Sequence, residues 1–162
     1  MKTIELTQGK VALVDDADYL YLNQFKWHAH LHYSGRIWYA IRGTVRDDGR
    51  KTTIPMHRVI MKARPDEQVD HIDHDGLNNQ RINLRLCTVS QNAGNSNKHK
   101  HSRNPYKGVH LTDSGRYRAY ITINSRRINL GRFDDPIEAA EAYDAKAREV
   151  FGEFALTNFK RE

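Results

Sequence analysis

The stretch "VDHIDHDGLNNQRINLRLCTVSQNAGN", residues 69–95, is crowded with short polar side chains. It holds three aspartates, two histidines and five asparagines, and its apolar residues follow no helical spacing. Aspartates around a glycine suit a calcium loop, in which the glycine is the sixth residue. Placing Gly76 sixth puts His71 first and Ile82 twelfth, where carboxylates are required. A calcium loop is therefore excluded.

Asp70 and His71 supply the two groups that metal-dependent hydrolysis of a phosphodiester needs. A carboxylate is a hard oxygen ligand for a divalent cation, and an imidazole is a base that titrates near neutral pH. Adjacent residues on a strand point to opposite sides, so a twist of the backbone must bring both to one site. The strand is expected to lead into a turn at Asp75 and Gly76.

The rest of the stretch predicts a second short strand followed by a helix. The strand is "NLRLCT", residues 83–88. Thr88 and Gln91 then form a capping box, which starts a short helix that carries Asn92 and Asn95. Two strands and a helix would bring Asn92 to the same site as the aspartate and histidine described above.

Residues 69–92 resemble the HNH (ββα-metal) nuclease motif, in the variant found in homing endonucleases of phages and mobile introns. The resemblance implies that Asp70 and Asn92 bind a single divalent metal ion, Mg²⁺ with Mn²⁺ as the alternative. It also implies that His71 is the catalytic general base. Asn83 joins the catalytic set as the central asparagine, which braces the loop between the strands. In this variant Asn92 stands where the family's name has its final histidine.

Some polar residues of the stretch have no catalytic or metal-binding role in this interpretation. Two of them, Asn78 and Asn79, match the family consensus. We expect all of these residues to shape the loop or to touch DNA. They are His74, Asn78, Asn79 and Asn95.

Charge is distributed unevenly along the chain, whose formal net charge is +6. Residues 93–132 hold nine Lys or Arg against one acid, whereas acids outnumber bases from Asp134 onward. A basic segment followed by an acidic amphipathic one indicates a polyanion-binding face backed by a supporting element.

The last third of the chain predicts a three-stranded antiparallel sheet covered on one face by one helix. "GRYRAYITI", residues 115–123, alternates in the manner of a half-buried strand. The inward set is Tyr117, Ala119, Ile121 and Ile123, and the outward set is Arg116, Arg118, Tyr120 and Thr122. The next strand continues with Ile128 and Leu130 inward and Arg127 and Asn129 outward.

A helix is expected after the sheet. Asp135 is its N-cap, Pro136 occupies its first position and Gly152 follows its end. An apolar stripe would lie on the sheet, formed by Ala140, Tyr143, Ala147 and Val150.

The segment from Tyr106 to Phe159 resembles an AP2 DNA-binding domain. That family lays its sheet in the major groove, so the resemblance implies DNA contacts on the face opposite the helix. The expected contact residues are Lys107, His110, Arg116, Arg118, Tyr120, Thr122, Arg127 and Asn129. Ser114, Tyr120 and Asn129 depart from the plant pattern, so the target sequence cannot be borrowed.

We expect an α+β fold with four segments. These are a β-rich module at 1–62, the HNH module at 63–97, a basic linker at 98–105 and the AP2-like domain at 106–162. The N-terminal strands are expected in "KVALV", "KWHAHLHY", "IWYAIR" and "KTTIPMHRVIM". The linker adds the DNA-binding candidates Lys98, Lys100 and Arg103, with His99 and His101 placed for phosphate or minor-groove contact.

Several observations concern the compartment. No apolar run approaches the roughly 18 residues of a membrane span, and the N-terminus has no apolar signal region. A single cysteine, Cys87, excludes an internal disulfide and a cysteine-rich zinc cluster. These features suit a reducing cytoplasm, here that of a bacterial host cell.

The N-terminal histidines leave alternatives open. His28, His30 and His32 could share a strand face and hold a metal, but further ligands are missing, so surface positions are favoured. His57 and Arg58 precede the motif closely. They are expected to pack beside the site or to contact phosphate, and packing is favoured.

The leading hypothesis is a site-specific, metal-dependent HNH endonuclease that acts on double-stranded DNA as a monomer or a homodimer. The first rival is a non-catalytic, sequence-specific DNA-binding regulator with a degenerate HNH scaffold. The second rival is a general nuclease without sequence preference, which the AP2-like segment disfavours.

Overall fold

The computed structural model describes residues 1–33, 35–96 and 104–160. The DNA-contact predictions for Lys98, Lys100 and Arg103, and those for His99 and His101, therefore lie outside the described residues. The chain forms two compact units, Met1–Cys87 and Thr88–Glu162. The boundary falls within the 63–97 range expected for the HNH module. Helices and strands occur in both units, which confirms the α+β class.

The first unit contains three small antiparallel sheets. Its strands are β1 (Lys2–Glu5), β2 (Val11–Val14), β3 (His28–Leu31), β4 (Trp38–Val45), β5 (Lys51–Pro55), β6 (Gln68–His71) and β7 (Leu84–Cys87). Its helices are η1 (Thr7–Gly9), α1 (Asp16–Leu22), α2 (Met56–Met61) and η2 (Arg81–Asn83). The sheets are β1–β2, β3–β4–β5 and β6–β7.

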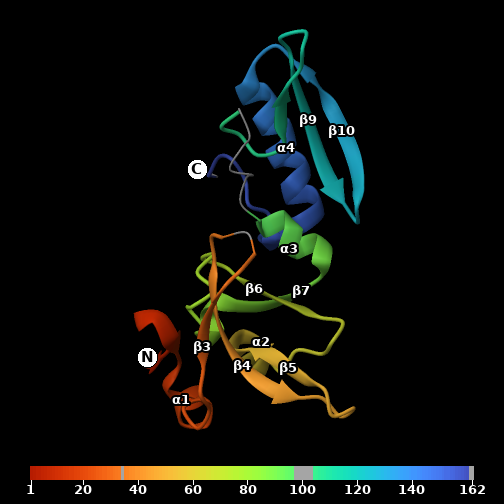
Figure 1. Cartoon of the computed structure of the whole chain (residues 1–162). Helices are drawn as coiled ribbons and strands as arrows, with labels where there is room; N and C mark the ends of the chain where they lie inside the picture. The colour runs from red at the N-terminus through yellow and green to blue at the C-terminus, as the bar shows by residue number, and fades with distance from the viewer. Residues whose placement is uncertain (34, 97–103, 161–162) are drawn as a thin grey trace. The chain divides into compact units, whose positions relative to one another are not determined.

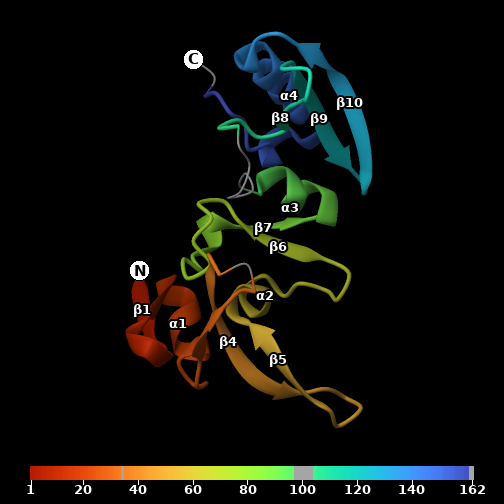
Figure 2. The same cartoon turned by 45° about the horizontal axis from the view of Figure 1, so that its top comes forward.

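The core of the first unit joins these sheets to the helices. Figure 2 shows α2 beside β4 and β5, and α2 also packs against β6 and β7. Leu22, Trp27, Met56 and Ile60 are among its buried residues. The helix α2 therefore links the central sheet to the hairpin that carries the motif.

One expected strand of this unit is wrong in its second half. "KTTIPMHRVIM" was expected to be a strand throughout, but the strand ends at Pro55 and Met56–Met61 is helical. Pro55 has extended backbone angles and stands at the N-cap position, so the strand passes directly into the helix. A short apolar run fits either element, and here tertiary packing decides.

The second unit has the architecture expected from its sequence. Its elements are α3 (Val89–Asn95), β8 (Val109–Leu111), β9 (Tyr117–Ile123), β10 (Arg126–Phe133), α4 (Pro136–Phe151) and η3 (Gly152–Phe154). The sheet order is β10–β9–β8, all antiparallel, and α4 lies along one face of it (Figure 1). The Asp135 carboxylate accepts from the Ile137 amide at 2.9 Å, which confirms the expected cap.

The inward face of the sheet is confirmed with one exception. Ala119 and Ile121 are buried, as are Ala140, Tyr143 and Ala147 of α4. Ile128 was expected inward, but it is 39% exposed. It lies on the edge strand β10, just before the register shift between Asn129 and Gly131.

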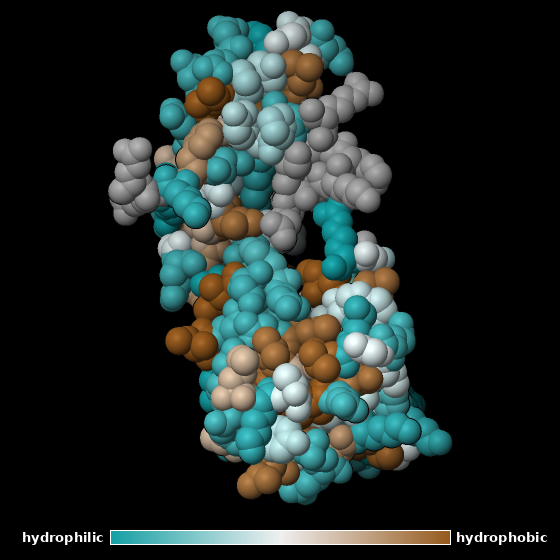
Figure 3. Space-filling view, turned by 90° about the vertical axis from the view of Figure 1, so that its left-hand side faces the viewer, coloured by the Kyte–Doolittle hydropathy of each residue, from teal (hydrophilic) through white to brown (hydrophobic). Residues whose placement is uncertain are grey.

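Exposed apolar residues in the first unit are dispersed. On the face of this unit shown in Figure 3, hydrophobic side chains are interspersed with hydrophilic ones. Scattered apolar exposure of this kind is normal for a small domain. In the parts of the chain that the structure describes, no helix has the length and apolarity to cross a bilayer.

Candidate nuclease site and DNA-binding face

The β6–β7 hairpin holds Asp70 and fixes its carboxylate. Asp70 pairs in register with Arg85, and His71 with Leu84. The Arg85 guanidinium donates to Asp70 Oδ2 from Nε at 2.9 Å and from Nη2 at 2.8 Å. Both side chains are largely buried, so solvent screens this charge-assisted pair weakly. Asp70 is therefore held as an oriented carboxylate.

His71 is buried within a cluster of three aromatic rings. Its ring centroid lies 4.9 Å from that of His57, at 88°, and 5.8 Å from that of Tyr39. Tyr39 and His57 also contact each other at 5.4 Å. The cluster joins β4, α2 and β6 and restricts the imidazole of His71. His57 therefore packs beside the site, as favoured from the sequence.

The sequence interpretation missed Tyr39. This residue lies more than thirty positions before His71, and it reaches the site because β4 pairs with β5, which leads into α2. Burial raises the pKa of its hydroxyl, with a further contribution from the charge on Asp70. Only the "WYAIR" strand pattern marked this region, and that pattern carries no information on a nuclease site.

Burial sets the protonation state of both histidines. It lowers the pKa of His71, while the neighbouring Asn79 carboxamide and the charge on Asp73 oppose the shift. Burial also lowers the pKa of His57 to about 3, assisted by the charges on His71 and Arg58. Near neutral pH both imidazoles are therefore neutral, which is the form of His71 that can accept a proton.

His57 makes the first unit sensitive to acid. Between pH 6.5 and about 3 the unfolded chain binds a proton that folded His57 does not, so stability falls as the pH falls. We expect a loss of about 1.4 kcal/mol per pH unit in the free energy of unfolding. Urea unfolding followed by tryptophan fluorescence measures it, because both tryptophans, Trp27 and Trp38, lie in this unit.

The matched variant for this prediction is His57→Gln, which removes the titratable group. Between pH 6.5 and 4.5 its free energy of unfolding should change with pH less steeply than that of the wild type, by about 1.4 kcal/mol per pH unit. Equal slopes in the two proteins would show that His57 is protonated in the folded state.

Asn83 braces the loop between β6 and β7. Its Oδ1 accepts from the Asp73 amide at 3.0 Å. Its Nδ2 donates to the Asp73 carboxylate at 2.9 Å and to the Asn78 carbonyl at 2.8 Å. The backbone carbonyl of Asn83 accepts from Ile72 at 3.0 Å. This buried side chain therefore ties both ends of the loop together.

The other asparagines of the loop have structural contacts. The Asn78 carboxamide donates to Asp73 at 2.7 Å. Asn79 is fully buried, and its backbone N–H donates to the backbone carbonyl of Leu13 in β2 at 2.8 Å. Arg81 adds a two-point ion pair with Asp18 of α1, at 2.8 and 2.7 Å. The loop is thus attached to the N-terminal elements of its own unit.

Gly76 is required by a close approach to β4. A Cβ atom at this position would lie 2.4 Å from the Trp38 carbonyl oxygen and 2.6 Å from the Tyr39 ring. Any side chain would push the loop away from the strand. The glycine that suggested a calcium loop therefore lets the loop pack against the ring beside His71.

Asn92 lies in the second unit, on α3. The expected capping box is present: Thr88 Oγ1 accepts from the Gln91 amide at 3.2 Å, and Gln91 Oε1 accepts from the Thr88 amide at 2.9 Å. The carboxamide of Asn92 and the carboxylate of Asp70 both offer hard oxygen atoms, which suits Mg²⁺ or Mn²⁺.

Histidine clusters do not offer an alternative metal centre. Residues 1–33, 35–96 and 104–160 contain no group of three His, Cys, Asp or Glu side chains placed to hold an ion. His28 and His30 are exposed on β3, in agreement with surface positions. Cys87 is buried and its burial raises the thiol pKa to about 11, which disfavours a nucleophilic thiolate.

The sheet of the second unit has a groove of about 630 Å³ on the face that bears the predicted DNA contacts. The rings of His110 and Tyr120 stack at 4.5 Å and 13°, and the Arg127 guanidinium lies 4.1 Å from the Tyr120 ring. Arg118 and Asn129 also line the groove. This face combines cations, planar rings and an amide, which is the chemistry of contacts to phosphates and bases.

Two of the predicted DNA contacts are engaged elsewhere in the protein. The Arg116 guanidinium pairs with Asp134 at 2.7 Å. Lys107 was also predicted to contact DNA, but its ammonium group is partly buried and donates to the Gly94 carbonyl at 2.6 Å. Gly108, which follows it, has a φ of 76° and packs against the Tyr143 ring, where a Cβ atom would not fit.

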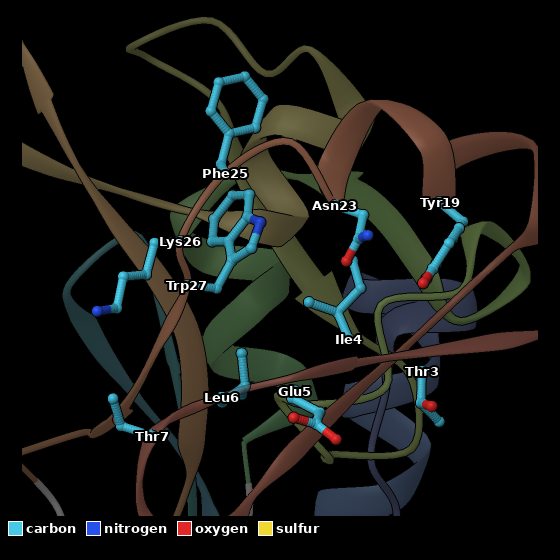
Figure 4. A pocket seen from close by; sticks show the side chains of 10 residues that line it. All are labelled: Thr3, Ile4, Glu5, Leu6, Thr7, Tyr19, Asn23, Phe25, Lys26 and Trp27. Carbon is cyan, nitrogen blue, oxygen red and sulfur yellow. The ribbon is translucent and has the colours of Figure 1, made fainter.

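A second pocket lies in the first unit and is shown in Figure 4. It has a volume of about 510 Å³ and is lined by residues of β1, α1 and the segment before β3. Phe25 and Trp27 contribute apolar surface, and Glu5 and Lys26 are its charged residues. The pocket lacks the acid–base groupings of the β6–β7 hairpin.

Comparison with known proteins gives one family model and several similar proteins. The family model described as HNH endonuclease matches residues 55–94. An uncharacterized HNH endonuclease of Acanthamoeba polyphaga mimivirus is 32% identical over 157 residues, which cover 93% of this chain and 76% of that protein. The chain belongs to the HNH endonuclease family. The match to the family model begins at Pro55, so it includes α2 and His57.

Less than half of the chain is also similar to two plant proteins that contain AP2/ERF domains. An AP2/ERF and B3 domain-containing transcription repressor of Arabidopsis thaliana is 37% identical over 73 residues, covering 45% of this chain and 20% of that protein. An AP2/ERF and B3 domain-containing transcription factor of the same plant is 37% identical over 71 residues, covering 44% and 21%. The similarity thus concerns about a fifth of each plant protein.

Proposed function

We propose that the protein is a site-specific, divalent-metal-dependent endonuclease that hydrolyses phosphodiester bonds in double-stranded DNA. One observation carries the proposal: a buried His71 beside an Arg85-held Asp70, on a hairpin whose loop is braced by Asn83. Burying an ionised carboxylate is costly unless it is well hydrogen-bonded, and the two hydrogen bonds from Arg85 meet this condition at Asp70. Membership of the HNH endonuclease family supports the same conclusion.

Asp70 and Asn92 are the proposed metal ligands. Mg²⁺ commonly takes one or two protein oxygens and completes its coordination with water and substrate phosphate oxygens. When bound, the ion would stabilise negative charge on the phosphate and on the leaving 3′ oxygen. Arg85 holds the Asp70 carboxylate in a single orientation for this purpose.

His71 is the proposed general base. It takes a proton from water, and the resulting hydroxide attacks phosphorus in line with the leaving oxygen. The rings of His57 and Tyr39 orient the imidazole, and the charges on Asp70 and Asp73 favour its protonated form after the transfer. One such site per chain cuts one strand, so a monomer would nick and a homodimer could cut both strands.

The sheet of the second unit is proposed to anchor the protein on duplex DNA. Replacing Arg127 by alanine removes a cation and the partner of the Tyr120 ring, so DNA affinity should fall about 5- to 100-fold. The slope of log affinity against log salt concentration should become shallower by about one, because one fewer counterion is released on binding. Binding measured by fluorescence anisotropy in EDTA at several salt concentrations tests this. The matched control Arg46→Ala, in the β4–β5 turn, should leave affinity unchanged. If the two variants bind equally, the sheet face does not contact DNA.

Product analysis separates the proposed function from its rivals. DNA fragments are first enriched by repeated selection for binding to the full chain in EDTA, and Mg²⁺ or Mn²⁺ is then added. A site-specific endonuclease yields discrete end-labelled products, whereas a general nuclease yields ladders. A DNA-binding regulator leaves the bound fragments intact with every divalent ion.

The similarity to a viral protein supports an origin in a phage or other mobile element.

A further inference from the structure

The helix α3 is too short to be stable alone. It has seven residues, and isolated helices shorter than about 12–15 residues are marginal in water. Its orientation therefore depends on packing against its neighbours, α4 and η3. Because α3 carries the proposed metal ligand Asn92, whatever holds this helix also places that ligand.

Gly94 forms the packing contact. A Cβ atom at this position would lie 2.7 Å from Cγ and 2.8 Å from Cδ2 of the Phe151 ring. Only glycine permits the backbone of α3 to approach the end of α4 so closely. On the same helix, Ser90 Oγ accepts from the Asn124 amide of the β9–β10 turn at 3.3 Å.

Lys107 holds the end of α3 through the backbone. The last carbonyls of a helix have no partner within it, and Gly94 is one of these positions. Its carbonyl accepts from the Leu156 amide at 3.1 Å and from Lys107 Nζ at 2.6 Å. A cation near a helix C-terminus also interacts favourably with the helix dipole.

The backbone of Lys107 is itself fixed. Asn158 Oδ1 accepts from the Lys107 amide at 2.6 Å, and Asn158 Nδ2 donates to the Lys107 carbonyl at 3.2 Å. The Asp144 carboxylate, which is 1% exposed, accepts from the amide and the side chain of Asn158 at 2.8 and 2.9 Å. A continuous series of hydrogen bonds thus runs from α4 to the end of α3.

We infer that Lys107 is a positioning residue that fixes α3, and with it Asn92, on the DNA-binding unit. The attachment of α3 by Lys107 follows from the hydrogen bonds described above. Its effect on catalysis depends on the proposed function, in which Asn92 is a metal ligand. Burial lowers the pKa of Lys107 to about 8. A partly buried amine is costly, and two carbonyl partners, Gly94 at 2.6 Å and Leu156 at 3.5 Å, account for its presence here better than a phosphate contact would.

Lys107→Met in the full chain tests the inference, because it keeps most of the unbranched side chain and removes the ammonium group with its hydrogen bonds. Amide hydrogen exchange should become about 10- to 100-fold faster at residues 89–95, while β9 and α4 keep their protection. The Mn²⁺ concentration for half-maximal cleavage should rise about tenfold, with DNA affinity in EDTA unchanged. The control is Lys146→Met, which removes a half-buried α4 lysine that pairs with the exposed Glu149.

Each outcome decides between the inference and the proposed function. Wild-type exchange rates in α3 of Lys107→Met would overturn the inference. So would an equal loss of protection in α3, β9 and α4, because Lys107 would then stabilise the whole unit. If α3 alone loses protection but the wild type cleaves DNA with no divalent ion, the attachment of α3 stands and the proposed function fails.

Discussion

Replacing His71 by alanine should lower the rate of DNA cleavage about 10²- to 10⁴-fold, the usual contribution of a general base. Burial keeps this imidazole neutral near pH 7, the form that accepts a proton, and the neighbouring rings of Tyr39 and His57 restrict its orientation. Single-turnover rates on DNA selected for binding measure the effect.

Two controls make the His71 result specific. His28→Ala changes an exposed histidine of β3 and should cleave at the wild-type rate. DNA affinity in EDTA should be the same for the wild type and both variants, because neither residue lies on the sheet of the second unit, which is the proposed DNA-binding surface. A His71→Ala protein that cleaves within threefold of the wild type would remove His71 from the mechanism.

Asn83→Ala should destabilise the first unit by about 2–4 kcal/mol. The change removes the acceptor for the Asp73 amide and the donor to two further oxygen atoms, and it leaves buried groups unpaired. The loop would then no longer hold its ends together, and cleavage should fall with stability. Urea unfolding followed by tryptophan fluorescence gives the difference in the free energy of unfolding.

The matched control for Asn83 is Gln24→Ala. Gln24 is exposed and makes one hydrogen bond to the Leu20 carbonyl, so this change should cost less than about 0.5 kcal/mol. If Asn83→Ala is no more destabilising than Gln24→Ala, the side chain of Asn83 is not the brace of the loop.

The sequence predicted elements whose signals are local. Asp135, Pro136 and Gly152 mark both ends of α4, and Thr88 with Gln91 marks the start of α3, because caps depend on residues close in the chain. The alternation along β9 likewise identified its buried face, since a single helix covers one side of the sheet.

Features that depend on distant partners could not be predicted. Tyr39 reaches His71 only through the pairing of β4 with β5 and the packing of α2. Lys107 matched a family DNA contact, but its ammonium binds the Gly94 carbonyl because Gly108 and Asn158 fix its backbone. The strand predicted across Met56–Met61 is a helix for a similar reason: its apolar residues meet the core.

The most direct test of the central claim is the addition of Mg²⁺ or Mn²⁺ to a preformed complex between the protein and a supercoiled plasmid carrying a selected binding fragment. The account predicts conversion to nicked or linear DNA at discrete positions by the wild type, and no conversion in EDTA or by His71→Ala. A wild-type protein that binds this plasmid but leaves it supercoiled with every divalent ion tested would contradict the account.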